Sequence, residues 1–260
     1  MTTAATQRYV TSEVEDGIAV LTLTRAEKRN ALSLAVMHEL IGALEAIAAR
    51  DERVVVIRAL GPAFSAGHDL REMLRRDVAA YREIFDVCVR LMSLLQEIPQ
   101  PVIAEVAGIA TAAGCQLVAA CDLAIAETDA KFATPGVRIG LFCTTPMVAL
   151  TRAIGRKRAM EMLLTGDFID AQTAADWGLI NRAVAPDRLA SEVMELAAKV
   201  ASSARFVVGL GKAAFYRQIE LDQASAYAYA KEVMSVNALA ADAQEGMAAF
   251  VDRRTPTWKP

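Results

Sequence analysis

The sequence predicts an α/β fold followed by a helical region at the C-terminal end. Over the first 185 residues, strand-like apolar runs alternate with helical patterns, which is typical of a mostly parallel sheet covered by helices. Beyond that point the patterns are helical and rich in alanine, without a strand-like run longer than three residues. We therefore predict an α/β core over residues 1–185 and a helical region over residues 186–260.

The first elements can be placed from local signals. Residues 9–15 and 18–24 alternate apolar and polar side chains around Asp16-Gly17, which predicts a β-hairpin. Ser33 is a suitable N-cap for a helical pattern that runs to about Arg50. A second helical pattern covers residues 79–96 and ends before two prolines.

Two strand-to-helix turns share one pattern. Residues 63–70 follow the apolar run 53–60, and residues 107–116 follow the predicted strand Val102–Val106; both precede helical patterns, and a further strand is predicted over residues 123–126. Such turns present free backbone N–H groups at helix starts, where the helix dipole favours negative charge. If the two turns converge, they form a pocket that stabilises an oxyanion on a carbonyl substrate.

The composition excludes several classes of protein. The 260 residues are 54% hydrophobic, which is enough for a large core, and the formal net charge of −3 argues against a nucleic-acid-binding surface. No apolar run reaches the ~18 residues of a membrane-spanning helix, so we expect no membrane segment. The polar residues 1–9 lack the apolar centre of a signal peptide. We therefore expect a cytoplasmic protein.

Cysteine and histidine usage argues against a metal centre. The four cysteines form no CxxC pair and lie in apolar contexts, which favours buried, reduced thiols, and there are only two histidines. We expect no bound metal.

Five blocks of the sequence, in this order, resemble the crotonase, or enoyl-CoA hydratase/isomerase, superfamily. They are LTRAEKRNAL (23–32), FSAGHDL (64–70), GCQLVAACD (114–122), DAQTAADWGL (170–179) and QEGMAAF (244–250). The resemblance extends from about residue 14 to 258, and five ordered blocks are specific where one alone is weak. Two runs, residues 110–119 and 132–143, look most similar to one subgroup, whose motifs do not settle its activity.

The resemblance implies a ClpP-like spiral of ββα units whose helical C-terminal region forms homotrimers or hexamers. Members of the superfamily bind an acyl-CoA thioester and hold its carbonyl between two backbone N–H groups. By motif position these donors are expected to be Ala66 and Ala113. Coenzyme A would enter as part of the substrate, and no separate cofactor is implied.

The resemblance also implies which residues contact the ligand. The loop with Lys28 and Arg29 would lie along the pantetheine and adenine, and Phe250 and Arg253 would reach the nucleotide, in many members across a subunit boundary. Further expected contacts are Asp69, which can also cap the following helix, and Leu70, Gly136, Phe142, Cys143 and Thr144.

The sequence departs from the family at its acid–base positions. Hydratases carry two glutamates that deliver water, and here Gln116 and Gly136 stand in their places. Thr144 stands where some isomerases carry an acid. Because each acid–base group typically contributes ~10²–10⁴-fold to the rate, we do not expect efficient hydration by the usual mechanism.

His68 is the candidate replacement, since histidine titrates near neutrality. Some crotonase-type decarboxylases carry a similar Ser-Ala-Gly-His-Asp run and also lack the glutamates, and decarboxylation of a malonyl-type thioester needs only enolate stabilisation. Three hypotheses remain open. The chain is a hydratase/isomerase-type enzyme of fatty-acid or acyl-CoA metabolism, a malonyl-type acyl-CoA decarboxylase, or a non-catalytic acyl-CoA-binding protein.

Overall fold

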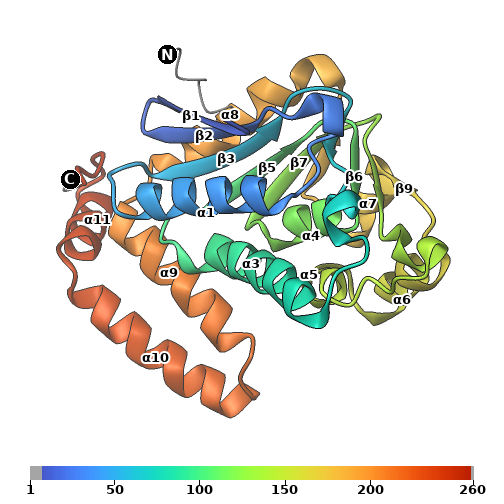
Figure 1. Ribbon diagram of the computed structural model, residues 1–260. Helices are drawn as coiled ribbons and strands as arrows, with labels where there is room; N and C mark the ends of the chain where they lie inside the picture. The colour runs from blue at the N-terminus through green and yellow to red at the C-terminus, as the bar shows by residue number, and fades with distance from the viewer. Residues whose placement is uncertain (1–7, 259–260) are drawn as a thin grey trace, which may run out of the picture.

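Two β-sheets form the centre of the computed structural model, which describes residues 8–258 (Figure 1). The six-stranded sheet has the order β1-β2-β3-β5-β7-β10, and the four-stranded sheet has the order β4-β6-β8-β9. Strands of the large sheet are β1 Val10–Glu15, β2 Ile18–Leu23, β3 Val54–Ala59, β5 Val102–Val106, β7 Leu123–Glu127 and β10 Arg182–Val184. Those of the small sheet are β4 Ala63–Ser65, β6 Ile109–Thr111, β8 Lys131–Ala133 and β9 Ile169–Asp170.

A ββα unit recurs along the chain. Strands β3, β5 and β7 of the large sheet are followed by β4, β6 and β8 of the small sheet, and each pair then leads into helices. These helices include α2 Leu70–Met73, α3 Val78–Glu97, α4 Ala113–Ala120 and α5 Pro146–Ile154. All neighbouring pairs of the large sheet other than β1–β2 are parallel, so the predicted α/β core is confirmed.

Local sequence signals were sufficient to predict the first hairpin and the start of the first helix. Asp16 and Gly17 both have positive φ, 49° and 76°, as a two-residue hairpin turn requires. Helix α1 (Leu34–Ala48) begins where predicted, because the Ser33 side chain accepts a hydrogen bond from the Val36 N–H. Residues 1–7, most of the segment expected to lack a signal peptide, lie outside the described residues.

Helices cover both faces of the large sheet. The inward side chains of α1, α3 and α4 pack with Leu21, Ile57 and Ala104 in the main core. Helix α8 (Leu189–Ala201) packs on the opposite face against Val20, Val56 and other alternate side chains. The remaining helices of the core region are α6 Arg156–Thr165 and α7 Ala171–Trp177, with the short 3₁₀ helices η1 Ala26–Lys28, η2 Pro135–Ile139 and η3 Pro186–Arg188.

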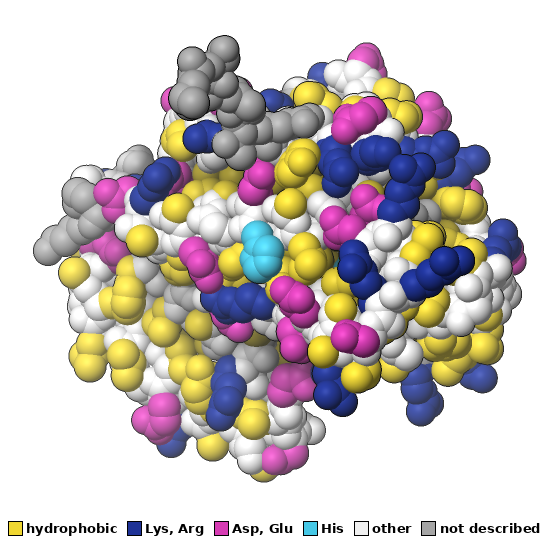
Figure 2. Space-filling model, in the orientation of Figure 1, with side chains coloured by type: hydrophobic (Ala, Val, Ile, Leu, Met, Phe, Trp, Pro, Cys, Tyr) yellow, Lys and Arg dark blue, Asp and Glu magenta, His cyan; other side chains and the backbone are white. Residues whose placement is uncertain are grey.

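The C-terminal helices α9 (Arg205–Gln218), α10 (Gln223–Leu239) and α11 (Ala241–Val251) extend away from the sheets (Figure 1). With α8 they make four α-helices where about three were predicted, since an extended residue, Ala240, separates α10 from α11. Helix α10 buries none of its residues, and hydrophobic side chains gather on this part of the surface (Figure 2). The division at residue 185 and the oligomerising role stay predictions.

No helix within residues 8–258 combines the length and the apolar character needed to cross a lipid bilayer.

A buried charged cluster attaches α9 to the core. Lys212 donates to the carboxylate of Asp122 at 2.7 Å and to the backbone carbonyls of Leu95 (2.6 Å) and Gln100 (2.8 Å). The other oxygen of the Asp122 carboxylate accepts from the Tyr216 hydroxyl at 2.8 Å. Burial lowers the pKa of Lys212, and the neighbouring Asp122 opposes this shift. One ammonium group therefore joins α9 to α3 and to the loops that contain Gln100 and Asp122.

Replacing Lys212 by methionine is expected to lower the free energy of unfolding by about 3 kcal/mol, because Asp122 loses its cation and two carbonyls lose their donor. Urea unfolding measures this difference. Lys199→Met on the exposed face of α8 is the matched control and should change stability by no more than about 0.5 kcal/mol. Equal stability of the two variants would show that the cluster contributes nothing.

Candidate active site

The two predicted turns touch through their backbones. A Cβ atom built on Gly67 would lie 2.9 Å from the Thr111 carbonyl oxygen and 3.0 Å from the Ala113 nitrogen. A Cβ on Gly114 would lie 2.3 Å from the Ser65 carbonyl oxygen. Gly67 also has a φ of 84°, which side chains rarely allow. The convergence expected from the sequence therefore occurs, and it depends on these two glycines.

Asn30 and Ser65 hold the first turn in place. The Asn30 amide donates to the carbonyls of Leu60 and Ala63, both at 2.8 Å. The Ser65 hydroxyl donates to the Asn30 carbonyl at 2.8 Å and accepts from the Gly67 N–H at 3.2 Å. The turn is thus bonded to the loop after β2 before any ligand arrives.

A cavity of ≈ 310 Å³ opens where the turns meet. Its walls are largely apolar, as is typical of sites for small organic ligands. The lining residues come from the two turns, α2, α3 and the segment from η2 to α5: Ala66, His68, Leu70, Met73, Phe85, Ala112, Ala113, Pro135, Gly136, Arg138, Ile139, Leu141, Phe142, Cys143, Thr144, Thr145 and Pro146.

The structure corrects one of the two expected backbone donors. The Ala66 N–H already donates to the Arg29 carbonyl at 3.0 Å, so it is not free for a ligand. Within residues 8–258, the backbone N–H groups of His68 and Ala113 have no hydrogen-bond acceptor, and both residues line the cavity. The available pair is therefore His68 and Ala113. The motif could not show this, because the Arg29 carbonyl comes from a distant loop.

His68 carries a titratable side chain as well as one of the two backbone donors. Its ring meets the Phe85 ring edge to face at 5.7 Å, and neither ring nitrogen makes a hydrogen bond of normal geometry among the described residues. Burial lowers the pKa of His68 from its ordinary value of 6.5, while the Leu32 backbone and Glu72 raise it to a smaller extent. The imidazole is thus neutral at pH 7, and its nitrogens have spare hydrogen-bonding capacity.

The two positions that the resemblance assigns to the hydratase glutamates, Gln116 and Gly136, offer no room for such a side chain in the cavity. The Gln116 side chain is buried against α3, where its carbonyl oxygen accepts a weak hydrogen bond from the Cys88 thiol at 3.9 Å, and it does not line the cavity. A Cβ on Gly136 would lie 2.5 Å from the Leu141 carbonyl oxygen and 2.8 Å from the Cys143 sulfur. The segment 141–143 therefore occupies the space that a glutamate at position 136 would need.

The cysteines are all free and buried, as expected. Cys143 lines the cavity, and burial raises the pKa of its thiol, which disfavours a nucleophilic thiolate.

Thr144 lines the cavity wall beside Cys143, whereas Asp69 caps α2 by accepting from the Arg71 N–H at 3.1 Å. Arg138 is committed to Asp167 and to the Thr165 carbonyl. Among the described residues, no three metal-binding side chains form a metal site.

The expected CoA contacts fall in two places. Lys28 and Arg29 are exposed on the η1 loop, and Arg29 is bonded through its carbonyl to the first turn. Figure 2 shows Lys and Arg side chains gathered at the upper right, toward the end of the molecule where this loop lies. Phe250 and Arg253 lie at the end of α11, on the opposite side of the subunit from η2 and α6 (Figure 1). Within one chain they do not reach the cavity.

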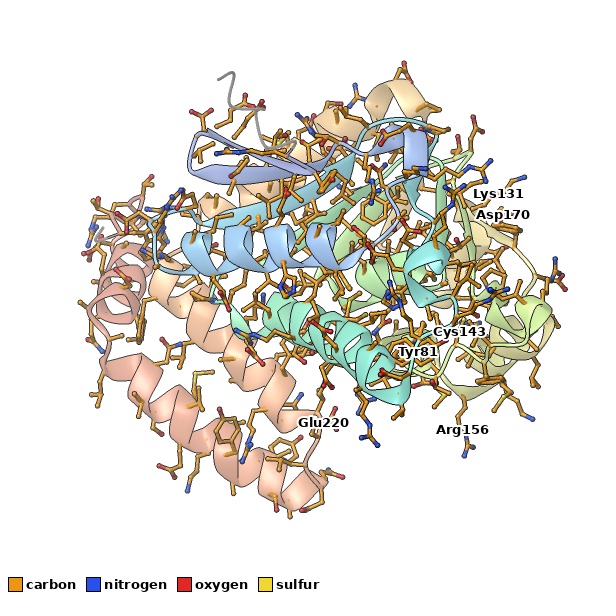
Figure 3. The ribbon with its side chains drawn as sticks, viewed as in Figure 1. Tyr81, Lys131, Cys143, Arg156, Asp170 and Glu220 are labelled. Carbon is orange, nitrogen blue, oxygen red and sulfur yellow. The ribbon has the colours of Figure 1, made fainter. Side chains whose placement is uncertain are left out.

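A second cavity, of ≈ 320 Å³, lies between α4 and α9 and is a poorer candidate. Its charged residues are already paired: Arg152 with Glu220 at 2.9 Å, and Asp122 with Lys212, which does not line the cavity. Figure 3 shows Glu220 at the end of α9, well apart from Cys143 in the first cavity.

Two residues that line the cavity, Phe85 and Leu141, were not predicted as site residues. Phe85 lies in the helical pattern of residues 79–96, and helical periodicity does not distinguish core from pocket lining. Leu141 lies in the run 132–143, which indicated the subgroup but not which of its residues face the cavity. Ala112 has φ 50° and ψ −119°, although its neighbour Ala113 starts a regular helix. The resemblance had marked this position, since it lies in the run where the family usually has glycines and an added Cβ there would narrow the acyl slot.

Comparisons with known proteins identify the family of the chain. The family described as Enoyl-CoA hydratase/isomerase matches residues 13–260. The rat protein "Enoyl-CoA hydratase domain-containing protein 3, mitochondrial" is 46% identical over 253 residues, which cover 96% of this chain and 84% of the relative. The subgroup indicated by residues 110–119 and 132–143 is therefore confirmed.

Solved structures give the same result for the fold. A crystal structure of an enoyl-CoA hydratase from Mycobacterium smegmatis has a TM-score of 0.95 and 47% identity, covering 97% of this chain and 99% of that chain. The human enoyl-CoA hydratase domain-containing protein 3 has a TM-score of 0.94 and 45% identity, covering 96% and 100%. The crotonase fold implied by the resemblance is confirmed.

The expected cytoplasmic location is contradicted. The relatives from rat, mouse and human all carry names that place those proteins in the mitochondrion. The expectation was wrong because free thiols and a short polar N-terminal segment argue only against secretion and do not distinguish among intracellular compartments.

The contact between the turns predicts that Gly114→Ala lowers the free energy of unfolding by about 3 kcal/mol, since the new methyl group overlaps the Ser65 carbonyl. Gly42→Ala is the matched control, because it lies in α1 with nothing within 4 Å of the added Cβ, and it should raise stability by about 1 kcal/mol. Urea unfolding of both variants measures these changes. A Gly114→Ala protein as stable as the parent would refute the contact.

The environment of His68 predicts a pKa below 6.5 in an NMR titration of its ring protons, with His38, exposed on α1, as the reference resonance. Because the unfolded chain then binds this proton more readily than the folded chain, the stability contributed by neutral His68 is complete above pH 6.5 and is lost as the pH falls below it. A His68 pKa at or above 6.5 would contradict the buried, neutral ring.

Proposed function

The chain belongs to the enoyl-CoA hydratase/isomerase family, and on this basis we propose that it binds an acyl-CoA thioester between its two turns and stabilises an oxyanion on the thioester carbonyl. The observation that carries the proposal is the pair of unpartnered N–H groups of His68 and Ala113 beside an apolar cavity. Donors without acceptors in an apolar wall are poorly satisfied, and a thioester oxygen would accept from both.

The chemistry follows from what these donors stabilise. When a proton leaves the α-carbon of a thioester, negative charge moves onto the carbonyl oxygen and an enolate forms. Backbone donors fixed before the reaction stabilise that charge, by about 10²–10³-fold per donor in acyl-transfer enzymes. The reaction class is therefore proton transfer at the acyl chain through an enolate, as an isomerase or a lyase requires.

His68 is the proposed proton acceptor and donor. It is neutral, its ring nitrogens are unpartnered, and it lies in the same turn as one of the two donors. Neither Gln116 nor Gly136 can take this role, because the first faces α3 and the second has no side chain. Hydration by two glutamates is thus replaced by single-base chemistry.

The rest of the ligand would extend over the surface. Lys28 and Arg29 carry the positive charge suited to CoA phosphates. Phe250 and Arg253 would act on a neighbouring subunit, since they lie far from their own cavity and α10 leaves an uncovered apolar face for association. We therefore propose a homotrimer or hexamer.

Decarboxylation of a malonyl-type thioester is the second candidate. It is favoured by the lack of a carboxylate among the cavity-lining residues, because loss of CO₂ gives the same enolate without a base. A mass-spectrometric screen of crotonyl-, longer enoyl- and malonyl-type CoA thioesters separates the two. Loss of CO₂ favours the decarboxylase, and binding of thioesters without any product favours a non-catalytic role.

His68→Ala tests the main proposal, because it removes the imidazole but keeps the backbone N–H. For the thioester that is turned over, kcat is expected to fall by ~10²–10⁴-fold with little change in Kd. His38→Ala on the exposed face of α1 is the control and should leave both constants unchanged. An unaltered kcat in His68→Ala would show that the ring does not transfer the proton.

A further inference from the structure

Ala112 has an unusual backbone conformation at the entrance to α4. Its φ of 50° and ψ of −119° lie in a region that glycine adopts readily and residues with a Cβ avoid. Six described residues other than glycine have positive φ, and of these only Ala112 lines the cavity. Alanine has no polar side chain that bonds locally to offset the strain.

The surrounding hydrogen bonds fix this conformation. The Ala112 N–H donates to the Ala133 carbonyl at 3.0 Å, and the Ala112 carbonyl accepts from the Gln116 N–H at 3.0 Å. The methyl group therefore has one defined direction. It points toward the first turn, since a Cβ built on Gly67 would lie 2.9 Å from the Ala112 Cβ.

This methyl group lies beside the position that the reacting carbons would take in the proposed binding mode. Ala112 immediately precedes the donor Ala113, and its methyl faces the turn that carries the other donor, His68. A thioester oxygen bound by both donors brings the carbonyl carbon and its α-carbon alongside the methyl. A hydrogen on the α-carbon fits a tight contact of this kind, and a methyl group there overlaps it.

We propose that Ala112 is a specificity-determining residue that excludes thioesters with a substituent on the α-carbon, so that the site takes linear acyl groups. The inference rests on the proposed function, because it requires the thioester carbonyl to be bound by His68 and Ala113. It narrows the substrate class to acyl-CoA thioesters with an unbranched α-carbon, malonyl but not methylmalonyl types included.

Isothermal titration of the full-length protein with butyryl-CoA and isobutyryl-CoA tests the proposal without requiring turnover. The two acyl groups have the same number of carbons, so the comparison isolates branching from apolar area. We expect butyryl-CoA to bind at least ~10-fold more tightly, the usual penalty for one misplaced methyl group. Ala112→Gly should reduce this ratio to nearly one by accepting the branched ligand.

Ala119→Gly is the matched control, because it is the same change in α4 at a position outside the cavity, and it should keep the parent ratio. Ala112→Ser enlarges the side chain instead and should widen the ratio, so the proposal remains testable if one variant folds poorly. Equal affinities of the parent protein for both ligands would refute the selection but leave the proposed function standing. Binding of neither ligand would overturn both.

Discussion

The contact between two backbones at Gly67 and Gly114 is the constraint on which the rest of the structure depends. Side chains at these positions would separate the turns, and the space between them would cease to be a site. The pairing of strands β4 and β6 supports this contact, since each strand leads into one turn and the register of the pair sets the distance between the two turns. The hydrogen bonds of Asn30 and Ser65 then fix the first turn before a ligand binds, so that the donors need no reorganisation.

Much of the fold was predictable because it rests on local signals. The Ser33 cap, the Asp16-Gly17 turn and the prolines after α3 are each read within a few residues, and the structure confirms them. The small sheet was not predicted, since strands of three residues show no period. Details of the site could not be predicted where they depend on residues distant in the sequence. The Arg29 carbonyl accepts the hydrogen bond of the Ala66 N–H, and segment 141–143 fills the space beside Gly136. No spacing of residues along the chain reveals such partners.

The cavity is lined by few charged groups. Burial keeps the His68 ring neutral and raises the pKa of Cys143, and Arg138, the one arginine among the lining residues, is paired with an exposed aspartate. In such surroundings, oriented backbone dipoles act with little competition from water or counter-ions. A site of this kind favours reactions whose charge develops on a single oxygen, which is the class of reaction proposed for this chain.

The order of helix α10 is expected to depend on the protein concentration. A helix of 17 residues that packs against α9 but fully buries none of its side chains is only weakly held within its own subunit, since isolated helices of that length are marginal in water. Its order is therefore linked by mass action to whatever covers it, and the protein concentration becomes a variable of its secondary structure. Amide exchange along one chain would then report assembly in α10 and global unfolding in the sheets.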